Sequence, residues 1–195
     1  KLPFTYALMI IGTLALTGFP LLSGFYSKDA IIEFAYLSGS TTGYYAAGIG
    51  IFTAFLTSIY SWRLMFKTFH GQYNNKEFKI EETHESPLVM LIPLIILSIG
   101  AIFAGFIFKD LFIGYEGINN FWNESIFFLE PLSTDHPPLW FLILTPTLVI
   151  LSIPLAYYLF VKNKNFPTQL VNINKPLYEF LLNKWYFDEV YDTLF

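Results

Sequence analysis

Long apolar stretches separated by short polar ones recur along this chain, and they predict helices that cross a membrane. The longest stretch runs from about Leu2 to Leu37. As one continuous helix it would be roughly 50 Å long at 1.5 Å per residue, which exceeds a hydrocarbon core of about 30 Å. Three more apolar segments follow, at about 44–69, 87–108 and 139–161. The pattern therefore predicts an all-α polytopic membrane protein with about four transmembrane segments.

Helix-breaking residues gather in the middle of the first apolar stretch, at Gly18, Pro20 and Gly24. Proline removes a backbone donor and clashes with the preceding turn, and glycine relaxes the backbone. We therefore predict a discontinuous helix made of two half-helices, at about 5–17 and 25–38. Irregular backbone at membrane depth is tolerated only where protein or a wet cavity satisfies its polar groups.

The polar residues Ser27, Lys28 and Asp29 follow this break directly. We expect Ser27 to cap the second half-helix and Asp29 to lie in its first turn, where the positive end of the helix dipole favours an acid. Burial and the same dipole would both disfavour the charged form of Lys28. Since ionisable residues inside a membrane usually lie on an ion path, Lys28 is a candidate proton carrier. The alternative is a lysine that snorkels to the interface or pairs permanently with Asp29.

Further polar residues extend the candidate path in both directions. Glu33 comes four residues after Asp29 and shares its helix face, as a second stop for protons or as an acid near the outer mouth. Thr57 belongs to a polar stripe of the segment 44–69 that lines a hydrated path, bonds to a neighbouring helix or bonds back to its own helix. The stripe comprises Thr53, Thr57, Tyr60, Ser61 and Thr68, with Lys67 at its edge.

A basic cluster ends the same segment, with Arg63, Lys67 and His70 on one helix face. These side chains either snorkel towards lipid phosphates or form a proton relay from the inner surface. In the third segment, Gly100 and Gly105 are available for close helix contact, and Pro146 and Pro154 are expected to kink the fourth.

Composition supports a membrane protein and excludes several other classes. Hydrophobic residues make up 54% of the chain and charged residues 13%, with a net charge of −4, which does not suggest nucleic-acid binding. The absence of cysteine excludes disulfides, iron–sulfur ligation and thiol catalysis within the chain. The three histidines lack the spacing of metal ligands, so no metal site is expected.

The basic residues also predict an orientation. If the broken helix is one crossing, nine of them fall on one side and Lys109 alone on the other, which fits the positive-inside rule. The C-terminal tail is then cytoplasmic, or matrix-side in a mitochondrion. The nine residues are Lys1, Arg63, Lys67, Lys76, Lys79, Lys162, Lys164, Lys175 and Lys184.

The motif GFPLLSGFYSKDAII around the break resembles the antiporter-like subunit L of respiratory complex I, the proton-pumping NADH:quinone oxidoreductase, which is called chain 5 in mitochondria. The resemblance covers essentially the whole chain. It extends, in the same order, to LPFTYALMIIGTLALTGFP, SIYSWRLMFKTFHG, HESPLVMLIPL and KWYFDEVYD. The sister subunit M typically carries a glutamate in place of Lys28.

The resemblance implies a C-terminal fragment with three parts. Residues 1–70 would end the second antiporter-like repeat, with a broken helix at 4–38 and a helix at 44–69. Residues 71–161 would hold two further transmembrane helices and an outer loop at 109–138. Residues 162–195 would form an interfacial helix that leads to a lateral helix absent here.

The resemblance also implies a role for the chain and its residues. Lys28 matches the lysine that exchanges protons with the outer side, and Asp29 matches its neighbouring acid. Proton translocation would be coupled to electron transfer from NADH to quinone. No cofactor would bind this chain, because NADH, FMN, the iron–sulfur clusters and quinone would belong to partner subunits.

The implied partners are other complex I membrane subunits, above all subunit M, together with lipid and protons. The expected location is a bacterial inner membrane, or a mitochondrial one. A subunit of an Mrp-type cation/proton antiporter and a membrane scaffold that transports nothing are the alternatives.

Overall fold

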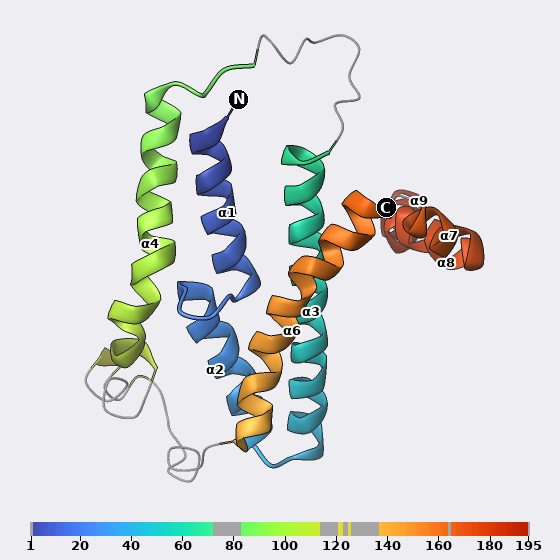
Figure 1. The fold of residues 1–195 in the computed structure, drawn as a ribbon. Helices are drawn as coiled ribbons and strands as arrows, with labels where there is room; N and C mark the ends of the chain where they lie inside the picture. Colours follow the sequence, from blue (N-terminus) through green and yellow to red (C-terminus); the bar gives the residue numbers. More distant parts are fainter. Residues whose placement is uncertain are drawn as a thin grey trace.

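The computed structural model describes residues 2–71, 83–113, 121–122, 125, 137–163 and 165–194, and within these ranges the chain is helical and without strands (Figure 1). The all-α fold class is therefore confirmed. The residues between the second and third apolar segments, 71–86, and the outer loop expected at 109–138 lie mostly outside the described residues. We also expect a short interfacial helix in the FWNESIFF stretch (121–128), and most of that stretch lies outside them as well.

The first apolar stretch is a broken helix, as predicted. Helix α1 (Pro3–Thr17) and helix α2 (Ser23–Leu37) have 15 residues each and follow one another in one crossing (Figure 1). The break occupies residues 18–22. The second half begins two residues earlier than predicted, and this shift changes the electrostatics around Lys28 described below.

Three long apolar helices complete the bundle, and each is long and apolar enough to span a membrane. Helix α3 (Thr41–Phe69) is capped by Ser40, whose side chain accepts a hydrogen bond from the Gly43 N–H at 3.0 Å. The others are α4 (Leu88–Phe112) and α6 (Leu139–Tyr157), which passes through two prolines and continues as a π-helical turn, Tyr158–Lys162.

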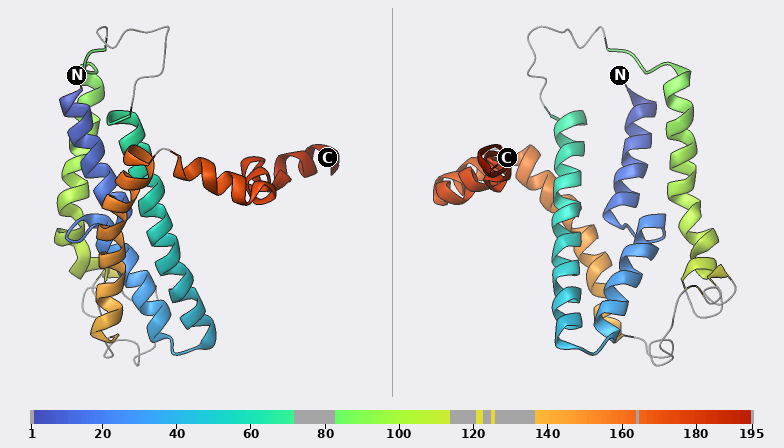
Figure 2. Two further views of the ribbon diagram at one scale, coloured as in Figure 1. Left: turned by 45° about the vertical axis from the view of Figure 1, so that its right-hand side comes forward. Right: turned by 180° about the vertical axis from the view of Figure 1, so that it is seen from behind.

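The broken helix lies between α4 and α3, and α6 packs across α3 (Figures 1 and 2). Two small cores hold this arrangement together. Near the inner end, Trp62, Met65 and Phe66 of α3 pack on Ala156 of α6. Near the other end, Ile32 of α2 packs with Ala47 of α3 and Phe141 of α6. Most other large apolar side chains are exposed, as expected of a surface that faces lipid.

Polar contacts are sparse between the long helices. One pair is fully buried, because Ser58 of α3 and Ser152 of α6 lie with their hydroxyl oxygens 2.5 Å apart. Inside hydrocarbon each hydroxyl needs a partner, so the pair fixes how α6 sits on α3. Ser61 is also buried, and its hydroxyl oxygen has no hydrogen-bond partner within the described part of the chain.

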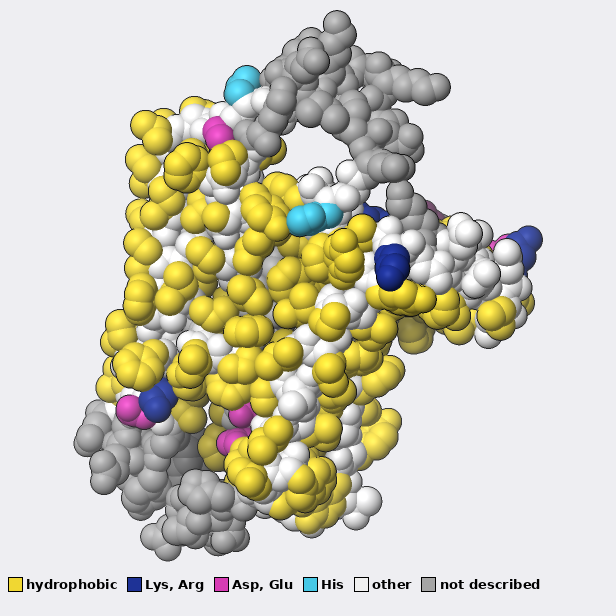
Figure 3. Space-filling view, viewed as in Figure 1, with side chains coloured by type: hydrophobic (Ala, Val, Ile, Leu, Met, Phe, Trp, Pro, Cys, Tyr) yellow, Lys and Arg dark blue, Asp and Glu magenta, His cyan; other side chains and the backbone are white. Residues whose placement is uncertain are grey.

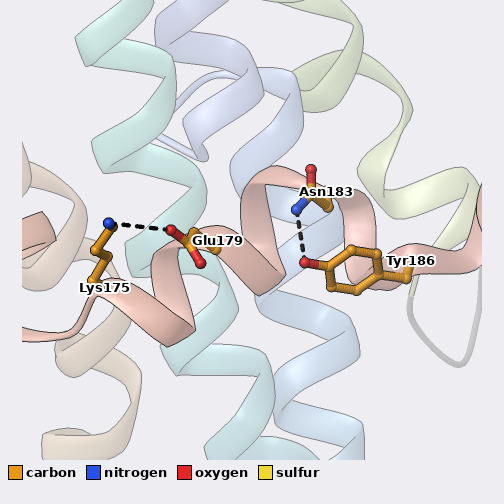
Figure 4. A network of polar contacts seen from close by, with 4 residues as sticks. All are labelled: Lys175, Glu179, Asn183 and Tyr186. Carbon is orange, nitrogen blue, oxygen red and sulfur yellow. Dashed lines mark hydrogen bonds and ion pairs between the residues drawn. The ribbon is translucent and has the colours of Figure 1, made fainter.

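The C-terminal tail leaves the bundle sideways (Figure 2). In place of the single interfacial helix predicted, it forms three short helices, α7 (Phe166–Ile173), α8 (Lys175–Leu182) and α9 (Phe187–Leu194). The chain turns between α8 and α9 at residues 184–186, whose φ angles are positive. Figure 4 shows the contacts that hold this region: Lys175 lies 3.7 Å from Glu179, and the Asn183 amide donates to the Tyr186 hydroxyl at 2.8 Å.

Candidate functional site: the helix break and Lys28

Helix α1 ends in a Schellman turn. Gly18 has a φ of 79°, its N–H bonds to the Ala15 carbonyl, and the Phe19 N–H bonds to the Leu14 carbonyl. This pattern satisfies two of the last carbonyls of the helix. It leaves the carbonyl of Leu16 without a backbone partner from the turn, at membrane depth, where an unsatisfied carbonyl is costly.

Lys28 supplies the missing donor. Its side chain reaches from α2 across the break, and its Nζ donates a hydrogen bond to the Leu16 carbonyl oxygen at 2.5 Å. Its aliphatic stem runs past Gly18, where an added Cβ would lie 3.3 Å from the Lys28 Cδ. The site therefore consists of a lysine from α2 that binds the C-terminal end of α1.

This position corrects the expected electrostatics around the lysine. Helix α2 begins at Ser23, so Ser27 does not cap it, and its hydroxyl instead donates to the Gly24 carbonyl. Asp29 is likewise outside the first turn. The dipole effect fades within one turn, so the α2 dipole acts little on Lys28, whose ammonium instead faces the negative end of α1. The nearest dipole therefore acts in the opposite sense to the one predicted.

Gly24 brings the two half-helices together. A Cβ placed there would lie 1.9 Å from the Ala15 carbonyl oxygen, so any other residue would push α2 away from α1. Of the three predicted breakers, Gly18 and Gly24 have specific conformational or steric roles, and Pro20 lies inside the turn between them. Leu21, which follows Pro20 in this turn, has a φ of 73°, which is strained for a leucine.

On the outer side of Lys28, Asp29 and Glu33 are both partly buried and line a cavity of about 190 Å³ between α2 and α4. Their common helix face agrees with the predicted spacing. The Lys28 ammonium binds the Leu16 carbonyl, and the ion pairs found among the described residues join other side chains.

The predicted inner relay is not joined to Lys28 in the described residues. The Tyr6 hydroxyl and the His70 Nε2 are 2.8 Å apart, which ties the inner ends of α1 and α3. Lys67 is exposed, and Arg63 lies over the Phe160 ring at 5.4 Å. Tyr6 precedes Leu16 by ten residues, or about 15 Å of helix. Thr57 is partly buried, and no hydrogen bond links it to Lys28 in the described part of the chain.

Glu85 makes polar contacts with α1 that the sequence did not indicate. Its carboxylate accepts hydrogen bonds from the Thr5 hydroxyl at 2.7 Å and from the Phe4 N–H at 2.8 Å, so it caps α1 from a position 80 residues away. A capping residue so distant has no local spacing signal.

Comparisons of the sequence with known proteins show what the chain is similar to. A family model for NADH:quinone oxidoreductase/Mrp antiporter transmembrane segments matches residues 1–57, which include the whole break. NADH-ubiquinone oxidoreductase chain 5 of Phytophthora infestans is 41% identical over 97% of this chain, and that of Marchantia polymorpha is 40% identical over 98%. Over nearly its whole length, the chain is similar to part of chain 5. It is 41% identical to the Chondrus crispus relative as well.

The chain spans about 29% of the length of the first two of these chain 5 relatives. Helices α3, α4 and α6, together with the family match, make it a multi-pass membrane protein. The relatives are subunits of an enzyme complex by name. The similarity to chain 5 relatives agrees with the resemblance drawn from the motif around Lys28 and favours it over the Mrp-type alternative.

Proposed function

We propose that this chain is part of a proton-translocating membrane subunit of NADH:quinone oxidoreductase (complex I), and that Lys28 carries the translocated proton. One observation supports the role of Lys28 above the others. Within the described part of the chain, this partly buried ammonium in the middle of a membrane helix is held by a backbone carbonyl, and the ion pairs found there join other side chains. A lysine without a fixed counter-ion can lose its proton without breaking an ion pair, as a carrier must.

In this proposal the Lys28 ammonium gives up one proton and becomes a neutral amine, and the Asp29 carboxylate accepts that proton. Asp29 then releases it to water on the outer side and becomes a carboxylate again. A new proton from the inner side restores the ammonium, with Lys67, His70 and Thr57 as candidate relay residues. Glu33 is a second stop on the outer side.

Electron transfer belongs to other subunits in this proposal. The chain has no cysteine to ligate an iron–sulfur cluster, so we place NADH, FMN, the clusters and quinone in partner subunits. The adjacent antiporter-like subunit M is the proposed neighbour. Because the matching relatives are mitochondrial, we favour the mitochondrial inner membrane, with the bacterial inner membrane as the alternative.

The test is Lys28→Met in the full-length protein within the assembled complex, because methionine keeps the length of the side chain and removes its charge. We expect NADH-driven proton pumping to fall severalfold, while the quinone reductase rate measured with an uncoupler is retained. Lys175→Met is the matched control, since it removes an exposed lysine whose side chain pairs with Glu179 on the tail. Wild-type pumping by Lys28→Met would refute the proposal.

Purification distinguishes a complex I subunit from a subunit of an Mrp-type antiporter. A complex I subunit should co-purify with NADH dehydrogenase activity. A protein that instead exchanges sodium for protons in vesicles without that activity would be an Mrp-type antiporter.

A further inference from the structure

Helices α2 and α4 run in the same direction and touch at Gly105 (Figure 1). A Cβ on Gly105 would lie 2.5 Å from the Ser23 Cα and 2.7 Å from the Tyr26 ring, so only glycine allows this approach. The expected role of Gly105 in close contact is thus observed, whereas Gly100 has nothing within 4 Å.

The contact at Gly105 determines what lies one turn further along both helices. Four residues after Gly105, and on the same face of α4, Lys109 extends towards α2 and places its Nζ 5.8 Å from the centre of the Tyr26 ring. The sequence had suggested that Lys109 belongs to an outer loop. The structure instead places it in the last turns of α4, facing α2.

Beyond this contact lies the outer cavity of about 190 Å³, in which both helices contribute charged side chains. Asp29 and Glu33 come from α2, and Lys109 and Asp110 come from α4. In Figure 3 acidic side chains line a hollow at the lower end of the molecule, beside a basic and an acidic side chain. The apolar part of the lining comprises Phe25, Tyr26, Ala30 and Ile113.

Lys109 is held in this cavity, but weakly. Its Nζ is 3.8 Å from the Asp110 carboxylate, and the Asp110 side chain is 86% exposed while that of Lys109 is 38% exposed. An exposed ion pair and a cation above a tyrosine ring both bind loosely. Lys109 is therefore only loosely bound to Asp110, and it lines the same cavity as the two acids of α2.

We infer that Lys109 is a positioning residue for proton release, whose ammonium drives protons off the carboxyl groups that line the outer cavity. This inference rests on the proposed function. A nearby positive charge favours the ionised form of a carboxyl group. A proton that reaches Asp29 or Glu33 is therefore released to water in the cavity and leaves a carboxylate.

The charged and titratable groups around Lys109 determine whether a substitution strengthens or weakens proton binding by Asp29 and Glu33. Tyr26, Asp29 and Glu33 face it from α2, and Asp110 adjoins it on α4, within the described part of the chain. Without Lys109 the two acids of α2 should hold protons more strongly. Without Asp110, Lys109 loses the anion that draws it outwards and should act on those acids more strongly.

The experiment measures pumping by the whole complex in vesicles whose lumen, the side that receives protons, is buffered at a series of pH values. An acidic lumen inhibits release, so each variant has a lumen pH at which the coupled rate is half-maximal. We expect Lys109→Met to raise that midpoint by about 1 pH unit. Asp110→Asn should lower it, and Lys109→Arg should leave it at the wild-type value because the charge is kept.

Two controls distinguish a failure of the inference about Lys109 from a failure of the proposed function. Lys175→Met removes a lysine from the tail and should leave the midpoint unchanged. Lys28→Met, assayed alongside, tests the proposed function by itself. If Lys28→Met stops pumping but Lys109→Met shows the wild-type midpoint, the inference about Lys109 is wrong and the proposed function stands. A Lys109→Met protein that merely assembles less, with an unchanged midpoint in the assembled fraction, overturns the inference equally.

Discussion

The close approach at Gly24 should be the least tolerant position of the helix break. In Gly24→Ala the new Cβ would lie 1.9 Å from the Ala15 carbonyl oxygen, and ordinary contact begins at 3.4 Å. The start of α2 must therefore move away from α1 by about 1.5 Å. Overpacking of this kind costs about 1–3 kcal/mol, against the roughly 0.5–1 kcal/mol that alanine gains over glycine in a helix.

The displacement should harm function more than stability. The Lys28 Nζ lies 2.5 Å from the Leu16 carbonyl oxygen across the same gap, so a shift of that size breaks the hydrogen bond. We expect Gly24→Ala to lower the thermal midpoint of the purified complex by a few degrees. Pumping per assembled complex should fall as far as in Lys28→Met.

Other glycines of the chain provide matched controls. Gly12 and Gly48 lie inside helices, and a Cβ at either position would meet nothing within 4 Å. Alanine there should be neutral or slightly stabilising. The measurements are thermal unfolding followed by an intrinsic probe, and proton pumping in vesicles. If Gly24→Ala behaves like Gly12→Ala in both assays, the close contact between the half-helices does not exist as described.

Two further predictions concern contacts outside the break. Partial desolvation alone would raise the pKa of Glu85, but hydrogen bonds from Thr5 and Phe4 outweigh it and hold that pKa below its ordinary value of 4.5. The cap on α1 thus stabilises the fold above that pH and is lost as the pH falls through the lowered pKa. Thermal midpoints measured from pH 6 down to below the lowered pKa should therefore show an acid sensitivity that Glu85→Gln lacks. Ser152→Ala should cost about 1–3 kcal/mol because it leaves the buried Ser58 hydroxyl alone. Ser58→Ala should cost less, because the Ser152 hydroxyl also donates to the Val149 carbonyl. The double variant should lose less than the two single losses added together, and additive losses in thermal unfolding would contradict the pairing.

The sequence predicted the helices and the break because both depend on local chemistry. Apolar runs of the right length give the spans, and Gly18, Pro20 and Gly24 lie within a few residues of one another. The expected order of half-helices is the one observed. The start of α2 was misplaced because Ser27 looks like a helix cap. Gly24 instead permits close packing on α1, which allows α2 to begin at Ser23.

The contacts of the site could not be predicted in this way, because they join residues that are distant in sequence. The carbonyl that Lys28 binds is a backbone atom, made available by the particular turn at Gly18. Glu85 reaches α1 from 80 residues away, and Lys109 reaches α2 only because Gly105 sets the register of two parallel helices. A side-chain pattern along one helix carries no information about such partners.

Because of the hydrogen bond between Lys28 and Leu16, the conformation of the break and the protonation of the lysine are thermodynamically coupled. If a movement of α2 relative to α1 changes how strongly Lys28 holds its proton, then loading or removing that proton must bias the same movement by the same free energy. A force exerted on this helix from elsewhere in an assembly would thus change the protonation of Lys28 without any electron carrier nearby. In reverse, a proton-motive force acting on Lys28 would strain the hinge at Gly18 and Gly24, and through it whatever is attached to α1 and α2.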